Sequence, residues 1–225
     1  MKRKRYGAIT AVVVISFGIL QADEGPEVDK KTHNALRSMV MDSCANDTID
    51  IPCDTYVNSS TISLIGLHDV CIRFEPGTQV LLDDVYRDVI ELVGCTNVQI
   101  LGGYFRHVDP LPEYDCHGGV IIIDGCSGIT IDNCTVSGCG AMGFRIVGSE
   151  NIRIQHCLIE DNSFSAFYLR SFHDLDIDHC IIRNNGRLFY STGQADQTDL
   201  KMRNNEIYNN NSSFFDDGEI PGLRI

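Results

Sequence analysis

Basic residues are scarce in this chain of 225 residues: 18 lysines and arginines stand against 31 aspartates and glutamates, which gives a formal net charge of −13. Four of the basic residues lie at positions 2–5, so residues 23–225 carry 14 basic against 31 acidic side chains, a formal charge of −17. Surfaces that bind phosphate groups need a net positive potential. The charge therefore argues against nucleic acid or an anionic membrane surface as a partner, and we interpret it as favouring solubility outside the cell.

Long hydrophobic runs are also missing, with one exception at the N-terminus. The basic stretch "KRKR" (2–5) is followed by "YGAITAVVVISFGIL" (6–20) and then by "QAD" (21–23). This order is the layout of a secretory signal peptide, and the run is short for a membrane-spanning helix. We predict that residues 1–22 are a signal peptide cleaved after Ala22, that no membrane span is left after cleavage, and that the protein is secreted, periplasmic or bound at the cell surface.

The most prominent pattern in the sequence is an internal repeat. The stretch "NIRIQHCLIEDN" (151–162) returns as "DLDIDHCIIRNN" (174–185), with a cysteine and an asparagine at the same two offsets. A period in the low twenties indicates stacked supersecondary units, each too small to bury its apolar side alone. The aligned segments are "VCIRFEP" (70–76), "VQILGGYF" (98–105), "ITIDNCTVSGC" (129–139), "IRIQHCLIEDN" (152–162), "LDIDHCIIRNN" (175–185) and "LKMRNNEIYNN" (200–210).

A second set of apolar segments shows the alternation of half-buried strands. These segments are "VIELVG" (89–94), "VIIIDG" (120–125), "FRIVGS" (144–149) and "FYLRSF" (167–172). With a third short strand in each repeat and almost no helical pattern, the sequence predicts an all-β fold, a right-handed parallel β-helix over residues 46–225. A linker and a short capping helix are expected within residues 23–45. Leucine-rich repeats have a similar period, but their remaining half-repeat is a leucine-rich helix, whereas "SFSAFYLRSFH" (163–173) alternates like a strand.

Positions that recur at the period should form vertical columns, because the rungs of such a coil stack about 4.8 Å apart. Small apolar cysteines fit a narrow interior bend, so we expect free stacked thiols there. Asparagine accepts a left-handed backbone at a turn and can bond to the next rung. The expected columns are Cys134, Cys157, Cys180 and Asn205 in the interior, and Cys139, Asn162, Asn185 and Asn210 at the turn.

The remaining recurring residues lead to three smaller predictions. His156 and His179, which precede the column cysteines, should stack at the bend. Cys95 and Cys126 fall at equivalent positions of adjacent rungs and should also stack. Cys44 and Cys53 are the best candidates for a disulfide in an exported chain.

Over about residues 45–215 the sequence resembles the right-handed β-helix superfamily of pectate-lyase-like proteins. The entry supports this, because "KKTHNALRSMVMDSC" (30–44) has apolar residues at helical spacing before the strand "DTIDIP" (47–52), like the helix that caps such coils. The resemblance implies carbohydrate as the substrate class, although the fold also serves adhesins and structural proteins. The polygalacturonase-like motif set is absent in its order. At the far end, "FFDDGEIPGLRI" (214–225) begins another coil without an obvious cap, which predicts a partner or self-association there.

Pectate-lyase-like chemistry would need acidic oxygens to hold Ca²⁺ and a basic side chain to remove a proton. Outward positions of the first strand of each rung supply both types. We predict Arg153, Lys201 or Arg203 as the catalytic base and Asp176 and Asp178 as ligands of Ca²⁺. The alternative for the same residues is a set of cross-strand ion pairs that stabilises the sheet.

Two insertions into the repeat give a second candidate surface. The segments "DDVYRD" (83–88) and "RHVDPLPEYDCHGG" (106–119) leave the coil at the same edge and should lie side by side. Loops on a rigid scaffold commonly carry binding groups, but a solvated loop pair or a cation-binding pocket are alternatives. An exposed tyrosine between two arginines offers a stacking surface to a sugar ring. The predicted substrate-binding residues are His107, His117, Arg145, Tyr168 and Arg170.

The expected function is that of a secreted β-helix protein that binds an extracellular acidic polysaccharide. If it is an enzyme, it acts on this polymer as a polysaccharide lyase or, alternatively, as a glycoside hydrolase. The other reading is a non-catalytic envelope or surface module, in which the coil is a scaffold or an interaction platform. The sequence leaves open whether the protein is an enzyme.

Overall fold

The computed structural model describes residues 46–109, 117–138, 141–191 and 198–211, together with a helical stretch at 36 and 38–40. The predicted signal peptide, most of the predicted linker and cap, and residues 212–225 lie outside this part. No helix within it is long and apolar enough to cross a membrane. Its strands are β1 (Thr48–Ile51), β2 (Thr55–Asn58), β3 (Ile62–Ile65), β4 (His68–Phe74), β5 (Gln79–Leu82), β6 (Ile90–Val93), β7 (Thr96–Leu101), β8 (Tyr104–His107), β9 (Ile121–Asp124), β10 (Thr130–Asp132), β11 (Thr135–Ser137), β12 (Met142–Gln155), β13 (Leu158–Glu160), β14 (Ser165–Asp178), β15 (Ile181–Arg183), β16 (Phe189–Ser191), β17 (Thr198–Arg203) and β18 (Glu206–Tyr208).

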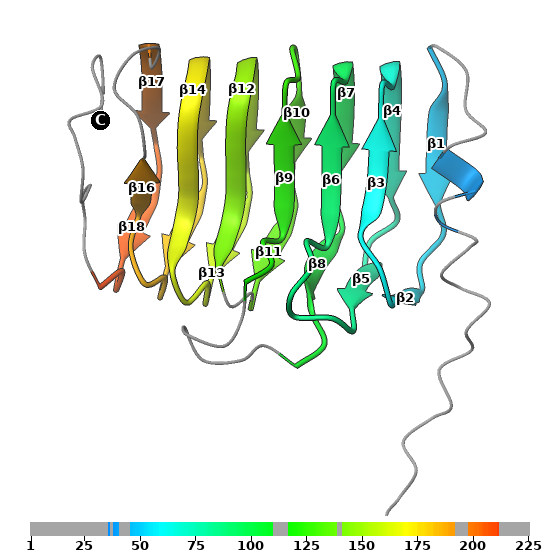
Figure 1. Ribbon diagram of the computed structural model, residues 1–225, viewed down its shortest axis with the longest axis horizontal. Coiled ribbons are helices and arrows are strands. Elements are labelled where there is room, and N and C mark those ends of the chain that lie inside the picture. The colour runs from blue at the N-terminus through cyan, green and yellow to red at the C-terminus, as the bar shows by residue number, and fades with distance from the viewer. Residues whose placement is uncertain are drawn as a thin grey trace, which may run out of the picture.

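Successive turns of the coil stack side by side, and their strands pair in parallel (Figure 1). Each turn contributes one strand to each of three faces. The first face consists of β3, β6, β9, residues 142–147 of β12, residues 165–170 of β14, and β16. The second consists of β1, β4, β7, β10, residues 150–155 of β12, residues 173–178 of β14, and β17. The third is the separate sheet of β2, β5, β8, β11, β13, β15 and β18. The predicted three-sided coil is confirmed.

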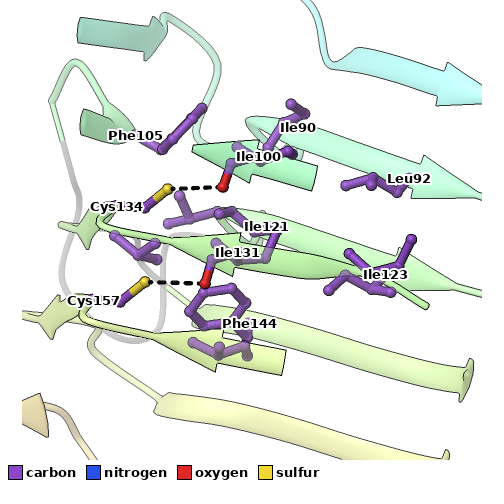
Figure 2. Packing of buried hydrophobic residues seen from close by; sticks show 14 of the residues in the cluster. Ile90, Leu92, Ile100, Phe105, Ile121, Ile123, Ile131, Cys134, Phe144 and Cys157 are labelled. Atoms are coloured by element: carbon purple, nitrogen blue, oxygen red, sulfur yellow. Dashed lines mark hydrogen bonds between the residues drawn. The ribbon is translucent and has the colours of Figure 1, made fainter. Parts of the chain in front are cut away.

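The interior of the coil is filled by the apolar side chains that strand alternation turns inward. Ile146 and Leu169 are fully buried, as are the phenylalanine rings of the first face. The rings of Phe144, Phe167 and Phe189 follow one another on successive rungs, with centroids 5.5 and 5.4 Å apart. Figure 2 shows isoleucines of neighbouring rungs packed in the same way. Burial of each such side chain contributes about 1.5–3 kcal/mol.

The predicted column of thiols lies at the bend between the second and third faces. Cys134, Cys157 and Cys180 are free cysteines and almost fully buried. Each sulfur donates to a carbonyl of the preceding rung, as Cys134 does to Ile100 at 3.8 Å (Figure 2). The hydrogen bond with Cys157, together with burial, raises the pKa of the Cys180 thiol, which therefore stays protonated. Asn205 continues the column by accepting a hydrogen bond from the backbone of Cys180 at 2.8 Å.

The asparagine column is also confirmed, at the turn between the third and first faces. The Oδ1 of Asn185 accepts from the backbone N–H of Asn162 at 3.1 Å and from its side-chain amide at 2.8 Å. In the same way, the Oδ1 of Asn210 accepts from the backbone and side-chain nitrogens of Asn185 at 3.0 and 2.9 Å. Cys139, which was predicted to continue this column, lies outside the described residues. The side-chain amides of this column therefore link the buried backbone of successive turns by hydrogen bonds.

A shorter column combines Cys95, Cys126 and Ser149. The backbone N–H of Cys95 donates to the sulfur of Cys126 at 3.3 Å, and the N–H of Cys126 donates to the hydroxyl of Ser149 at 3.1 Å. The predicted stacking of the two cysteines is therefore confirmed, and serine is compatible with this environment.

The N-terminal entry packs onto the first rung. Leu36 and Val40 of the helical stretch are buried, as a cap on the first rung requires. Cys53 is an exposed free thiol, and Cys44, its predicted disulfide partner, lies outside the described residues. The sulfur of Cys53 lies against Gly77 of the following rung, where a β-carbon would come within 3.2 Å of it.

Candidate functional site

The two inserted loops meet at the corner between the third and first faces, as the spacing predicts. The Nε2 of His107 lies 2.8 Å from the carbonyl oxygen of Arg87. The ring of His117 stacks on Tyr86 with centroids 5.7 Å apart, and its backbone N–H donates to the carbonyl of Val85 at 3.2 Å. These contacts fix the first loop against the second and form a rim along the start of β6 and β9.

The two histidines of the loops have different roles. His107 has no exposed surface, and burial lowers the pKa of its imidazole, so the ring is neutral. A side chain with no exposed surface cannot contact a substrate, and the predicted binding role of His107 is therefore wrong. It positions the loop through Arg87 instead. His117 is exposed at the rim, where a bound molecule can reach it.

The first face carries one row of outward residues beside this rim. Arg145 is the central residue of this row, and the Nη2 of Arg145 lies 3.9 Å from the Oδ2 of Asp124. Arg170 is exposed two positions beyond Tyr168 on the same strand, so the predicted group of one tyrosine and two arginines does gather on one surface. The row, in register across the rungs, is Glu91, Ile122, Arg145, Tyr168 and Tyr190, of which Ile122 is buried.

An aromatic patch, formed by Phe164, Tyr168 and Tyr190, ends this row. The tyrosine rings lie 5.6 Å apart, and Phe164 meets Tyr190 edge to face at 4.9 Å. The guanidinium of Arg187 lies over Phe164 at 4.5 Å. All four side chains are half-buried, so their contacts hold the rings in place while part of each stays open to solvent.

Asp88 is the carboxyl group with the most unusual environment on this surface. It precedes β6 and is half-buried, and its Oδ1 accepts a hydrogen bond from the backbone of Gly119 at 2.7 Å. Burial raises the pKa of Asp88; the Gly119 bond and the charge of Arg145 lower it in part, and Glu91 raises it further. A carboxyl group that keeps its proton to higher pH is suited to general acid catalysis.

The second face has a polar groove of about 320 Å³. Three of the residues predicted for catalysis and metal binding, Arg153, Asp176 and Lys201, do line one groove, whereas Arg203 is not part of its lining. The groove is lined by Asn97, Gly128, Thr130, Asn151, Arg153, Asp174, Asp176 and Lys201.

Ion pairs occupy most of the charged groups in and beside this groove. The Nζ of Lys201 lies 2.6 Å from Asp174, and the Nη2 of Arg203 lies 2.5 Å from Asp176. The hydrogen bond with Asp174 raises the pKa of Lys201, so its amine stays protonated and is unsuited to act as a base. The alternative of cross-strand ion pairs therefore describes Lys201 and Arg203. Arg153 is exposed and forms no ion pair with any described residue.

The predicted Ca²⁺ ligands do not fit a calcium site. Ca²⁺ takes about six to eight oxygen ligands. Asp176 is paired with Arg203, while Asp178 accepts from the side-chain amide of Asn204 at 2.9 Å and lies 3.1 Å from the Nδ1 of His179. In the described ranges, no three His, Cys, Asp or Glu side chains gather into a group that could hold a metal ion.

The two predicted sets of site residues lie on different faces. Arg145 pairs with β9 on the first face, whereas Arg153, on the same long strand, pairs with β10 on the second. The bend of β12 separates them. The predicted bases and the predicted sugar-stacking residues therefore cannot act on the same bond, and the first face with its rim is the better candidate.

Comparison with known families decides how the coil is classified. A family model described as the right handed beta helix region matches residues 88–220, more than half of the chain. The chain belongs to the right-handed β-helix family.

This β-helix is also similar to a solved structure, the crystal structure of a "putative glycosyl hydrolase" from Parabacteroides merdae. The TM-score is 0.57 at 15% sequence identity, over 83% of this chain and 90% of that chain. At this identity the likeness concerns the fold alone. A comparison with curated proteins finds no match.

Sequence reasoning on this β-helix placed Asp88 in a loop without assigning it a role, and it missed Glu91. Glu91 had a readable signal, because it is the charged residue at an outward position of "VIELVG", directly after the first insertion. The environment of Asp88 had none, since it depends on how the backbone of Gly119 in the second loop packs against it.

Proposed function

We propose that this β-helix binds an acidic carbohydrate polymer along its first face and hydrolyses it beside the inserted loops. The observation that carries the proposal is the half-buried carboxyl of Asp88, whose pKa is raised, next to Glu91 and Arg145. Arg145 and Arg170 supply positive charge for the carboxylates or sulfates of such a polymer. The fold shared with a protein titled a glycosyl hydrolase agrees with this reading.

Hydrolysis of a glycosidic bond commonly uses two carboxyl groups in different protonation states. In the proposed step, Asp88 gives its proton to the glycosidic oxygen as the bond from that oxygen to the anomeric carbon breaks. Glu91 acts as the carboxylate that takes a proton from the water whose oxygen bonds to the anomeric carbon. The hydroxyl of Ser63 donates to Glu91 at 2.5 Å and orients it.

Substrate binding is assigned to the row that leads away from this pair. Arg145 and Tyr168 lie on adjacent rungs, and Tyr190 follows on the next. A polymer that runs along the coil axis would pass from the carboxyl pair over Arg145 to the aromatic patch, where the rings can pack against sugar faces. His117 and Tyr86 would border it at the rim.

The test uses the full chain without its predicted signal peptide and a panel of neutral and acidic polysaccharides, with release of reducing ends as the measurement. Asp88→Asn keeps the shape and the acceptor for Gly119 but has no acidic proton, and we expect kcat to fall by about 10²–10⁴-fold. Asp176→Asn on the second face is the matched control and should cleave like the wild type. Wild-type rates in Asp88→Asn, an unsaturated product detected by its ultraviolet absorbance, or binding to none of the polymers would contradict the proposal; the last result would favour the scaffold alternative.

The pH dependence adds a second readout for Asp88. Because its folded-state pKa is raised, it contributes stability below its unfolded pKa, and this contribution is lost as pH rises through the folded pKa. Asp88→Asn lacks this loss, so urea unfolding should show the variant gaining on the wild type as pH rises through that window. The wild-type kcat should fall over the same window, since the acid loses its proton. A stability difference that stays constant with pH would contradict the assignment.

A further inference from the structure

The bend between the second and third faces carries a pair of histidines that the proposed chemistry does not use. His156 and His179 occupy equivalent positions on successive rungs, and their rings lie 5.5 Å apart at an angle of 32°. Their side chains are 56% and 54% exposed. Two imidazoles therefore stand next to each other at the surface, away from the first face.

Each ring is held by a carboxylate at the same atom. The Nδ1 of His156 lies 2.9 Å from Asp132, and the Nδ1 of His179 lies 3.1 Å from Asp178. An ionised carboxylate only accepts hydrogen bonds, so the proton of each neutral imidazole is on Nδ1. The lone pair is left on Nε2, at the other end of the ring. This is how carboxylates orient histidines that bind metal ions.

The supporting carboxylates are themselves fixed. The side-chain amide of Gln155 donates to Asp132 at 3.0 Å, and that of Asn204 donates to Asp178 at 2.9 Å. Both histidines thus have an ordered outer layer, of the kind that holds metal-binding imidazoles in one orientation.

The fold itself does not require histidine at these positions. The bend needs a positive φ, which is 51° at His156 and 52° at His179. On the rungs on either side, Asn133 and Asn204 hold the same bend with a φ of 55° each, and asparagine is the side chain better suited to this conformation. Two adjacent histidines, one supported by Asp132 of the preceding rung and the other by Asp178 of its own rung, are therefore an addition to the repeat.

We propose that His156 and His179 form a surface site for a divalent transition-metal ion that prefers imidazole, such as Zn²⁺ or Ni²⁺, each bound through Nε2. Zn–N bonds of about 2.0–2.1 Å require the two Nε2 atoms to come within about 4 Å of each other. Because more than half of each side chain is exposed, the rings are free to tilt toward each other. The site supplies two protein ligands and leaves the remaining positions to water or to an oxygen of a bound molecule.

The experiment titrates the metal-free full chain with Zn²⁺ by calorimetry and follows the imidazole nitrogens by NMR. We expect one equivalent to bind, with shifts at the Nε2 of His156 and His179. His156→Asn and His179→Asn keep the backbone of the bend, and each should abolish this binding event. Asp132→Ala, which removes the support of one ring, should weaken it by about 10–100-fold.

His68→Asn is the matched control. His68 is also exposed, with its Nδ1 3.5 Å from Asp69, but its neighbour in register is Thr96 rather than a second histidine. This variant should bind Zn²⁺ like the wild type, and so should Cys53→Ser, which removes an exposed thiol. Zn²⁺ binding that survives in His156→Asn or in His179→Asn, or that is lost in either control, would overturn the proposal. The outcome is independent of polymer cleavage, because these histidines lie outside the first face.

Discussion

Asn185 is the residue whose loss should show most directly how the turns are held together. It is 1% exposed. Its Oδ1 accepts two hydrogen bonds from Asn162, and its Nδ2 donates to the carbonyls of Ile159 and Arg183 at 3.1 and 2.9 Å and to Asn210 at 2.9 Å. Asn185→Ala removes all of these contacts while leaving the backbone in place.

The size of the effect follows from which groups are left without partners. The backbone N–H and the side-chain amide of Asn162 both lose their acceptor, and Asn162 has no exposed surface through which water could replace it. A buried donor left unsatisfied costs about 1–3 kcal/mol. Two such donors give an expected loss of about 2–6 kcal/mol in the free energy of unfolding for Asn185→Ala.

Urea unfolding followed by circular dichroism measures this loss, since the chain has no tryptophan to report by fluorescence. Asn210→Ala is the control, because Asn210 is half-exposed and water can replace its bonds to Asn185. The control should lose less than about 2 kcal/mol, with the same dependence on urea. A loss below about 1 kcal/mol for Asn185→Ala, or one equal to that of the control, would refute the reasoning.

Two further substitutions test the loop contact and the short column. In Gly119→Ala, the added β-carbon would lie 2.9 Å from Ile122 and 3.3 Å from the Oδ1 of Asp88. Displacing that carboxyl should lower the rate of polymer cleavage by about 10²-fold. An unchanged rate would mean that the position of the Asp88 carboxyl is not critical. Cys126→Ser should reduce the free energy of unfolding in urea by less than about 1.5 kcal/mol, because Ser149 already holds the next position of the column; a much larger loss would show that the column needs sulfur.

Periodic features of the coil could be read from the sequence because the period itself creates the contacts. Once Cys157 and Cys180 are known to recur on successive rungs, their stacking follows from the rung spacing alone. The same holds for Asn162 and Asn185, and for the two insertions, which must leave the same edge because both follow a strand of the third face.

The candidate site was less readable because its chemistry depends on side-chain choices that the period does not set. Arg203 is in register with Asp178, but its guanidinium pairs with Asp176, two residues earlier on the same strand. The raised pKa of Asp88 comes from its burial, at a place where the backbone of Gly119 in the second loop packs against it. Neither the diagonal pairing nor the packing of a non-repeating loop is contained in the spacing of the residues.

The two fourteen-residue strands have a mechanical consequence for the molecule. β12 and β14 pair in parallel from Met142 and Ser165 to Gln155 and Asp178, and each continues as one strand through the bend at the corner between two faces of the coil. Elsewhere that corner is crossed by two separate short strands. These two long strands should therefore stiffen the middle of the solenoid. Arg145 and Tyr168 lie on them, so a ligand that contacts both has to match the fixed spacing between these two side chains.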